Sequence, residues 1–276
     1  MSAFQVHSDF ILVRHLSFVG FERISQSLCK GLISAGFKAE NILVTDSDNS
    51  RLEIAEKELK TKTSSKNSDA ADFAQMVFLC VKPAGINSVL KEISDRLTEK
   101  HVIVSVAAGI KIKSIEKEVY CRVLRLMPNI AVSLKKGVNA VSFGKGFSEK
   151  EKQEFLDFFS GIGVVFEAEE KYFNLITVVS GSGPAFWARL IEYEINAVNS
   201  FGLEKEKARK LVLYSIEGTL ALLAGMKEKE LIDLVASPQG VTAERLKVLE
   251  EENIEESFLF SLKKALENAG ELSHGK

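Results

Sequence analysis

The chain has 276 residues, 46% of them hydrophobic and 27% charged, so it can bury the core of one large domain or of two ordinary ones. Its formal net charge of -2 gives no reason to expect nucleic acid or an anionic membrane as a partner. No apolar stretch approaches the length that spans a bilayer, and the first ten residues lack the pattern of a secretory signal, so we expect a cytoplasmic protein.

Cysteine and histidine usage argues against a disulfide framework and against a metal site. The cysteines are far apart and lie in apolar contexts, which predicts buried free thiols in a reducing compartment. The histidines are scattered without metal-ligand spacing, so we expect no metal. The cysteines are Cys29, Cys80 and Cys121.

Five short apolar runs alternate with helical patterns over roughly the first 165 residues. Runs without a polar face indicate strands buried on both sides, as in a parallel sheet covered by helices. The alternation predicts an α/β, doubly wound, Rossmann-like dinucleotide-binding domain over residues 1–167. Its expected strands are LSFVG (16–20), NILVTD (41–46), MVFLCVKP (76–83), HVIVSVAAG (101–109) and RVLRLMPN (122–129).

Helical patterns fill the segments between these strands. Residues 24–36 and 86–93 carry apolar stripes at helical spacing, and Ser148 with Glu151 predicts a capping box that opens a helix. Residues 1–15 precede all of these elements, and the sequence leaves open whether they add an edge strand or form a tail.

From about residue 168 the chain is expected to be helical. The strongest helical patterns cover residues 183–202, 204–225 and 254–270. The second of them is apolar around much of its circumference, and such a helix must be buried. Two explanations stay open: burial against another subunit, and the core of an ordinary helical bundle.

The segment FVGFERISQSL, residues 18–28, stands where a dinucleotide-binding chain has Gly-x-Gly-x-x-Gly. Gly20 keeps the first glycine, but Glu22 and Ser25 occupy the other two places. A carboxylate about 4 Å from a phosphate would cost roughly 4 kcal/mol at an effective dielectric near 20. Arg23 is available either to pair with Glu22 or to contact a phosphate. Taken alone, the segment is a weak fingerprint.

The end of the second strand, TDSDNSRL at 45–52, is compatible with either NAD or NADP as the cofactor. Asp46 fits the acidic residue that takes the ribose hydroxyls of NAD, or it forms an Asx turn instead. Ser47, Asn49 and Arg51 suit the 2′-phosphate of NADP.

Four further segments end in residues that allow a ligand to approach. Residues 81–83 and 106–109 end strands, where ligands of open α/β sheets bind. Residues 180–184 and 237–242 read as loops before helices, and the first of these suits a carboxylate or forms a plain helix cap. Neither loop contains a histidine that could activate a serine nucleophile.

Taken in order, these segments resemble pyrroline-5-carboxylate reductase over about residues 16–270. The most specific motifs are VVSGSGPAF and SPQGVT, supported by FLCVKP, VSVAAGIKI and LRLMPN. The resemblance implies a dinucleotide-binding domain followed by an all-helical dimerisation and substrate-binding domain over residues 168–276. It implies a homodimer, assembled in some relatives into a higher oligomer. It also implies NAD(P)H-dependent reduction of 1-pyrroline-5-carboxylate to L-proline, the last step of proline biosynthesis.

The resemblance further implies site residues, with NADP favoured over NAD. Thr242 matches the family threonine whose hydroxyl reaches the ring nitrogen, so we expect it to be the catalytic hydrogen-bonding group. The residues expected to bind cofactor are Gly20, Phe21, Glu22, Arg23, Ile24, Ser25, Ser47, Asn67, Val81, Lys82, Pro83, Ala107, Ala108 and Gly109. The residues expected to bind substrate are Ser180, Gly181, Ser182, Gly183, Ser237, Gly240, Val241 and Thr242.

The departures from the family pattern cluster at these expected sites. The family usually has Gly-Ala-Gly-Asn-Met-Gly at residues 20–25 and Ser-Pro-Gly-Gly-Thr-Thr at residues 237–242. Three hypotheses follow. The chain is a working, divergent reductase, or a catalytically weak or inactive paralogue with a binding or regulatory role. Alternatively, it reduces another cyclic imine, which Gln239 and Ile130 would select.

Overall fold

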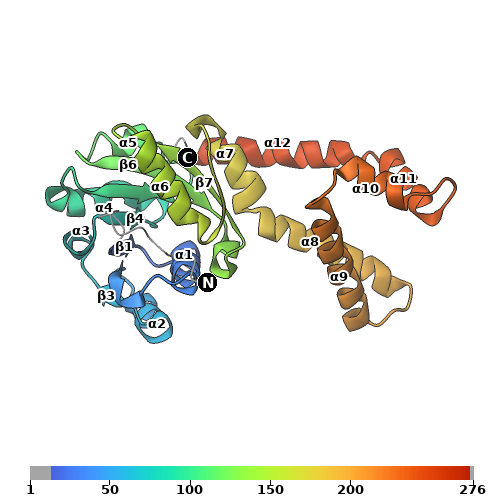
Figure 1. The fold of residues 1–276 in the computed structure, drawn as a ribbon, viewed down its shortest axis with the longest axis horizontal. Helices are drawn as coiled ribbons and strands as arrows, with labels where there is room; N and C mark the ends of the chain where they lie inside the picture. The colour runs from blue at the N-terminus through green and yellow to red at the C-terminus, as the bar shows by residue number, and fades with distance from the viewer. Residues whose placement is uncertain (1–13, 274–276) are drawn as a thin grey trace. The chain divides into compact units, whose positions relative to one another are not determined.

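The computed structural model describes residues 14–273 and divides into two compact units (Figure 1). The first unit runs to Pro184 and takes in the C-terminal segment from Leu266, and the second spans Ala185–Ala265. The question of an edge strand within residues 1–15 lies almost wholly outside the described residues.

The first unit is built on one sheet of eight strands in the order β3-β2-β1-β4-β5-β6-β7-β8. Neighbouring strands are parallel except β6 and β7, which are antiparallel. The chain leaves β1 toward β2 and β3, and then returns to place β4 on the other side of β1. The strand order therefore reverses between β1 and β4. The strands are β1 Leu16–Val19, β2 Ile42–Thr45, β3 Lys62–Ser64, β4 Met76–Leu79, β5 Val102–Ser105, β6 Arg122–Pro128, β7 Gly137–Phe143 and β8 Gly163–Glu167.

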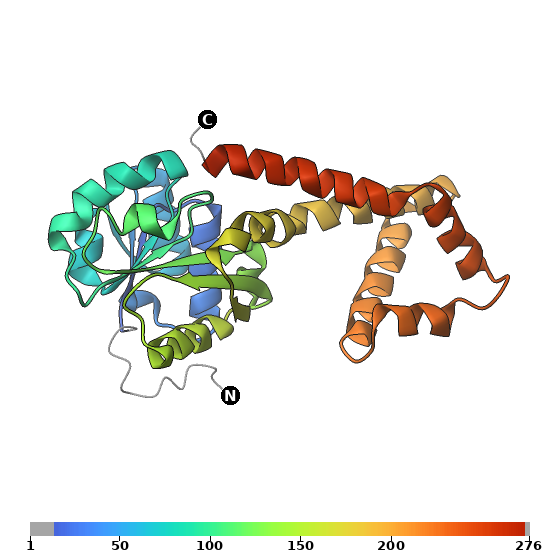
Figure 2. The same cartoon turned by 90° about the horizontal axis from the view of Figure 1, so that it is seen from above.

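Helices cover both faces of this sheet (Figure 2). Apolar residues of α1, α2 and α6 pack on one face, and those of α3, α4 and α5 on the other, so the central strands have no polar side. This confirms the predicted doubly wound α/β domain. The helices are α1 Arg23–Ser34, α2 Asn49–Leu59, α3 Ser68–Phe73, α4 Ile86–Ile93, α5 Ile112–Ile115, α6 Glu149–Ser160 and α7 Phe173–Ile176.

Two smaller predictions about this unit are also confirmed. The Ser148 hydroxyl accepts from the Glu151 N–H and the Glu151 carboxylate accepts from the Ser148 N–H, which is the capping box of α6. Cys29, Cys80 and Cys121 are buried free thiols. Burial raises the pKa of each, in the case of Cys121 to about 11.

The second unit contains helices only, most of them amphipathic or apolar. They are α8 Gly183–Ser200, which begins in the first unit, α9 Lys205–Leu223, α10 Glu228–Val235, α11 Val241–Glu251 and α12 Ile254–Ser273, which ends in the first unit. A small cluster of Ile195, Ala208 and Val212 is buried within it. By contrast, Leu220 of α9 is 64% exposed and Phe260 of α12 is 63% exposed.

These exposures decide between the two explanations for the apolar helices. A bundle core would bury the circumference of α9 within one copy of the chain, and the structure leaves Leu211, Leu220 and Leu222 exposed. The bundle-core alternative is therefore wrong for this face, and a large apolar surface remains for a partner. None of the helices between residues 14 and 273 combines the length and the hydropathy that a membrane crossing needs.

Candidate functional site

The candidate site begins where the strand order reverses, because ligands of open α/β sheets bind at that point beyond the carboxyl ends of the strands. Gly20 follows β1 there with φ +90°, a conformation that disfavours side chains. A Cβ atom on Gly20 would lie 2.8 Å from Cγ1 of Val81 and 3.0 Å from the carbonyl carbon of Cys80. Only glycine fits this turn, which carries the chain from β1 across the end of β4 into α1.

The N-terminus of α1 faces this turn without a side-chain cap. Glu22 is the residue before the helix, and within the described chain its carboxylate makes no capping hydrogen bond. The first-turn N–H groups therefore keep their capacity to hold an anion. Ser25, in the place of the third glycine, is fully buried and donates its hydroxyl to the Glu22 carbonyl oxygen at 2.9 Å.

Asp46 fastens the end of β2 to the same turn. Its Oδ2 accepts the Phe21 N–H at 2.7 Å, and its Oδ1 accepts the Asp48 N–H at 2.9 Å. The second bond is an Asx turn, so that alternative from the sequence is confirmed. Asp46 is only 7% exposed, and its carboxylate is directed inward to the Gly20–Ser25 loop.

Arg51, in the first turn of α2, faces three carboxylates at once. Its Nη1 lies 3.3 Å from Asp46, its Nη2 lies 3.4 Å from Glu22, and its Nε lies 3.5 Å from Asp48. Burial alone would lower the pKa of Arg51, but its hydrogen bond to Asp46 and the three negative charges raise it above the ordinary value. The guanidinium is therefore fixed in its charged form.

Glu22 completes this cluster. Its Oε1 lies 3.4 Å from Arg51 and 4.0 Å from Nζ of Lys82, and these are its ion-pair partners within residues 14–273. Of the two roles open to Arg23, pairing with Glu22 does not occur in the described residues, where Arg51 approaches Glu22 from a different helix. An open cavity of about 450 Å³ adjoins the cluster. It is lined by Phe21, Glu22, Arg23, Ile24, Gln26 and Arg51.

The other residues expected to bind cofactor gather along the same edge of the sheet. Ser47 follows β2, Val81 to Pro83 follow β4, and Ala107 to Gly109 follow β5. Asn67 accepts from the Thr45 hydroxyl at 2.9 Å, which holds it at the end of β2. The structure thus brings the fourteen residues named from the sequence to the carboxyl ends of adjacent strands.

The expectation that residues 180–184 form a loop is wrong. Residues Thr177–Gly181 continue from α7 as a π-helical turn and lead directly into α8. The Ser182 N–H donates to the Thr177 carbonyl at 2.9 Å, and Asn129 Nδ2 donates to the Ser180 hydroxyl at 3.4 Å. Because Asn129 follows β6, the turn lies at the carboxyl end of that strand. π-Helical turns occur frequently at functional sites.

Residues 237–242 belong to the second unit. The Gly240 N–H donates to the Ser237 carbonyl at 2.9 Å and closes a four-residue turn. Gln239, the third residue of that turn, has φ +60°, where glycine is the residue that fits without strain. Thr242 is the second residue of α11. Gly240 and the exposed Val241 directly precede it in the sequence.

The sequence motifs did not reveal the buried ion pair that Arg125 of β6 forms with Glu170. Arg125 is 3% exposed, and its Nη1 donates to Oε1 of Glu170 at 3.0 Å. Burial lowers the pKa of Arg125. The signal that could have revealed this pair was an arginine placed within the apolar run of residues 122–129, where a charge is buried only with a partner.

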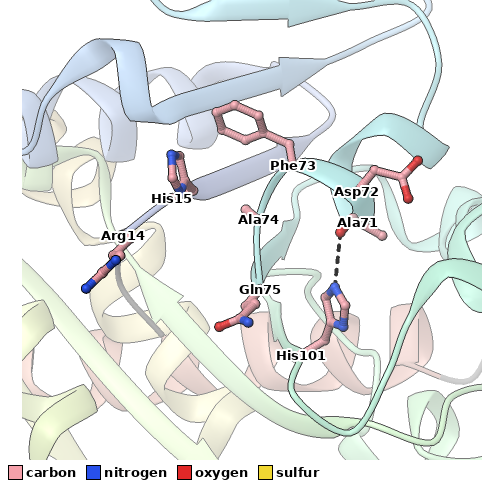
Figure 3. Close-up of a pocket in the computed structure, with 8 residues that line it drawn as sticks. All are labelled: Arg14, His15, Ala71, Asp72, Phe73, Ala74, Gln75 and His101. Carbon is pink, nitrogen blue, oxygen red and sulfur yellow. Dashed lines mark hydrogen bonds between the residues drawn. The ribbon is translucent and has the colours of Figure 1, made fainter. Parts of the chain in front are cut away.

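A second cavity, of about 360 Å³, lies at the opposite edge of the sheet (Figure 3). His15, Gln75 and His101 line it, and each directly precedes a strand. His101 accepts the Thr98 N–H at Nδ1 and donates from Nε2 to the Ala71 carbonyl at 3.0 Å (Figure 3). Its ring is fully used inside the fold, and the cavity lies away from the strand ends that bind ligands. Over residues 14–273 no group of three or more His, Cys, Asp and Glu side chains could hold a metal ion.

Comparison with known proteins agrees with this architecture. A family model described as pyrroline-5-carboxylate reductase dimerisation matches residues 170–272, and one described as NADP oxidoreductase, coenzyme F420-dependent, matches residues 15–109. The chain is 33% identical to pyrroline-5-carboxylate reductase of Corynebacterium melassecola, over 93% of this chain and 98% of that protein. It is 30% identical to the Methanosarcina acetivorans enzyme of that name, over 93% of this chain and 97% of that protein.

A solved structure is similar to the chain over both of its units. The crystal structure of Plasmodium falciparum pyrroline carboxylate reductase with NADP bound superposes with a TM-score of 0.85 at 25% identity. The match covers 95% of this chain and 99% of that one.

Proposed function

The chain belongs to the pyrroline-5-carboxylate reductase family, and we propose that it binds its nicotinamide cofactor at the carboxyl edge of the sheet, around Gly20. The resemblance read from the sequence motifs is thereby confirmed. The reaction of the family is the NAD(P)H-dependent reduction of 1-pyrroline-5-carboxylate to L-proline. One observation carries the assignment to this chain: the similarity extends over 98% of the Corynebacterium relative, so both domains of a reductase are present.

The residues around Gly20 fit an anionic dinucleotide. A Cβ atom would fill the space that the turn keeps open, and α1 presents an uncapped N-terminus beside it. The Glu22 carboxylate opposes a phosphate, but Arg51 and Lys82 offset its charge. In this proposal Gly20 to Ser25, Ser47, Asn67, Val81 to Pro83 and Ala107 to Gly109 surround the cofactor.

The chain's own groups position the substrate. When bound, NAD(P)H supplies the hydride that reduces the carbon of the C=N bond. The C=N carbon of a cyclic imine becomes electrophilic when the imine nitrogen accepts a hydrogen bond or a proton, so the protein contributes chiefly orientation. We assign the substrate carboxylate to the Ser180–Gly183 turn, and we assign Ser237, Gly240 and Val241 a role in substrate binding. The Thr242 hydroxyl donates a hydrogen bond to the ring nitrogen.

We further propose that the cofactor is NADP rather than NAD. Its support is the Arg51 guanidinium beside the end of β2, with Ser47 exposed next to it. The Plasmodium reductase, which is similar over 95% of this chain, has NADP bound.

Residues 168–276 act, in this proposal, as the dimerisation and substrate-binding domain. The dimerisation family model matches residues 170–272, and the exposed leucines of α9 supply an apolar surface for a second copy. A homodimer is the expected unit.

One assay tests the proposed function. The purified protein is mixed with 1-pyrroline-5-carboxylate and either NADPH or NADH, and both cofactor oxidation and L-proline are followed. Formation of L-proline supports a working reductase. Absence of turnover with both nucleotides would favour the inactive paralogue. Turnover only with a six-membered cyclic imine carboxylate would favour a different imine substrate.

A further inference from the structure

The three carboxylates around Arg51 are not equivalent. Asp46 is held by two backbone N–H groups, and Asp48 caps α2 by accepting the Ser50 N–H at 2.9 Å. Both are parts of the local backbone structure. Glu22 has cations as its ion-pair partners in the described chain, Arg51 at 3.4 Å and Lys82 at 4.0 Å. Of these three carboxylates, only that of Glu22 can therefore move away from Arg51 without breaking a turn or a helix cap.

From this difference we infer that Glu22 is a specificity-determining residue: its carboxylate occupies Arg51 as an internal anion, which the 2′-phosphate of NADPH has to displace. The inference rests on the proposed function, because it takes the Gly20 edge as the cofactor site. Under this inference, the Glu22 carboxylate weakens the binding of NADPH more than the binding of NADH.

The two nucleotides separate two effects of the Glu22 charge. Both carry the pyrophosphate, which meets the N-terminus of α1 beside Glu22, so repulsion there weakens NADPH and NADH alike. Only NADPH carries the 2′-phosphate, with a charge of about -1.5 to -2 near neutral pH. Only that group competes with Glu22 for Arg51. The ratio of the two dissociation constants therefore isolates the competition.

The exposure of the Glu22–Arg51 ion pair sets the expected size of the change in nucleotide affinity. The side chains of Glu22 and Arg51 are 35% and 36% exposed, so solvent screens their interaction in part. Neutralising Glu22 is expected to tighten NADPH binding about fivefold to tenfold and NADH binding about twofold.

The test is a double-mutant cycle read by calorimetry. Dissociation constants for NADPH and NADH are measured for the wild type, Glu22→Gln, Arg51→Gln and the double variant, with thermal shift at saturating nucleotide as a second measurement. The selective gain for NADPH is expected in Glu22→Gln and is expected to vanish on the Arg51→Gln background. Glu53→Gln is the matched control. Glu53 lies on α2 in an ion pair with Lys57 at 2.9 Å, and its substitution removes the same charge as Glu22→Gln. It should leave the ratio unchanged.

The outcomes separate this inference from the proposed function. If the wild type reduces 1-pyrroline-5-carboxylate while Glu22→Gln changes both dissociation constants by the same factor, Glu22 does not determine specificity and only the inference fails. The inference also fails if the gain persists without Arg51, or if Glu53→Gln reproduces it. If no variant binds either nucleotide, the proposed function fails and the inference fails with it.

Discussion

Arg125 and Glu170 form an ion pair that joins three segments of the first unit. Oε1 of Glu170 accepts from Nη1 of Arg125 at 3.0 Å and from the Ile112 N–H at 2.7 Å. Arg125 also lies over the ring of Phe173, 4.6 Å from its centroid. One carboxylate therefore ties the segment after Gly109 to strand β6 and to the short helix that leads into the π-helical turn.

Removing the carboxylate should destabilise the protein strongly. Glu170→Gln leaves the Arg125 charge buried without its ionic partner, which typically costs about 3 kcal/mol. Urea unfolding followed by circular dichroism measures the change. Glu169→Gln is the matched control, because Glu169 pairs with Lys171 at the surface, and its loss should cost less than about 0.5 kcal/mol. Equal effects of the two changes would show that the buried pair contributes nothing special.

Gln239 should be a source of strain that glycine relieves. Its φ of +60° is unfavourable for a residue with a Cβ atom, so Gln239→Gly is expected to stabilise the protein by roughly 0.5–1 kcal/mol after the entropy of glycine in the unfolded chain is counted. Asn253→Gly is the control, because Asn253 has φ +51° but asparagine tolerates that region. Thermal unfolding compares the two. A loss of stability in Gln239→Gly would mean that the glutamine side chain makes a contact worth more than the strain.

The fold was predictable where burial is complete on both sides of a strand. The runs that became β1, β2, β4, β5 and β6 are continuous and apolar because helices cover both faces of the sheet. The residues of β3, β7 and β8 form weaker strand patterns. None of the residues of β3 or β8 is buried, and β7 is interrupted by the buried amide of Asn139.

The position of the candidate site was predictable, but the ion pairs between its side chains were not. The order of the motifs located Glu22 in the Gly20 loop, yet its partner Arg51 is 29 residues away and reaches it only because the Asx turn at Asp46 places the first turn of α2 beside α1. The π-helical turn was missed for a different reason. Glycine, serine and proline in residues 180–184 are typical of a loop, but Ser180 and Gly181 end the π-helical turn and Gly183 and Pro184 begin α8.

The stabilisation by Glu151 should depend on pH. Hydrogen bonds from the Ser148 backbone and then from its hydroxyl, together with the charge of Arg122, lower the pKa of Glu151 in the folded state. Its contribution is therefore fully present above the unfolded pKa of about 4.3 and is lost as pH falls through the lower folded pKa. The difference in unfolding free energy between wild type and Glu151→Gln should be largest near neutral pH and shrink below pH of about 4.

Ser148→Ala provides the complementary measurement. It removes the hydroxyl that caps α6 and should cost about 1 kcal/mol at neutral pH. It should also reduce the acid dependence, because one of the hydrogen bonds to Glu151 is gone. A difference between wild type and Glu151→Gln that stays constant from pH 7 to about pH 3 would refute the assignment.

Thr242 is the residue on which turnover should depend most sharply. If its hydroxyl bonds the ring nitrogen as the imine is reduced, Thr242→Ala should lower kcat about a hundredfold, the typical effect of losing one aligned donor. NADPH binding should be unchanged, and Thr242→Ser should restore much of the rate because it restores the hydroxyl. Thr219→Ala is the matched control, because Thr219 lies in the same unit and its hydroxyl donates to the Ser215 carbonyl of its own helix. Steady-state kinetics at saturating NADPH distinguish the variants. A kcat for Thr242→Ala equal to that of Thr219→Ala would remove Thr242 from the mechanism, and the catalytic donor would then have to be sought in the Ser180–Gly183 turn.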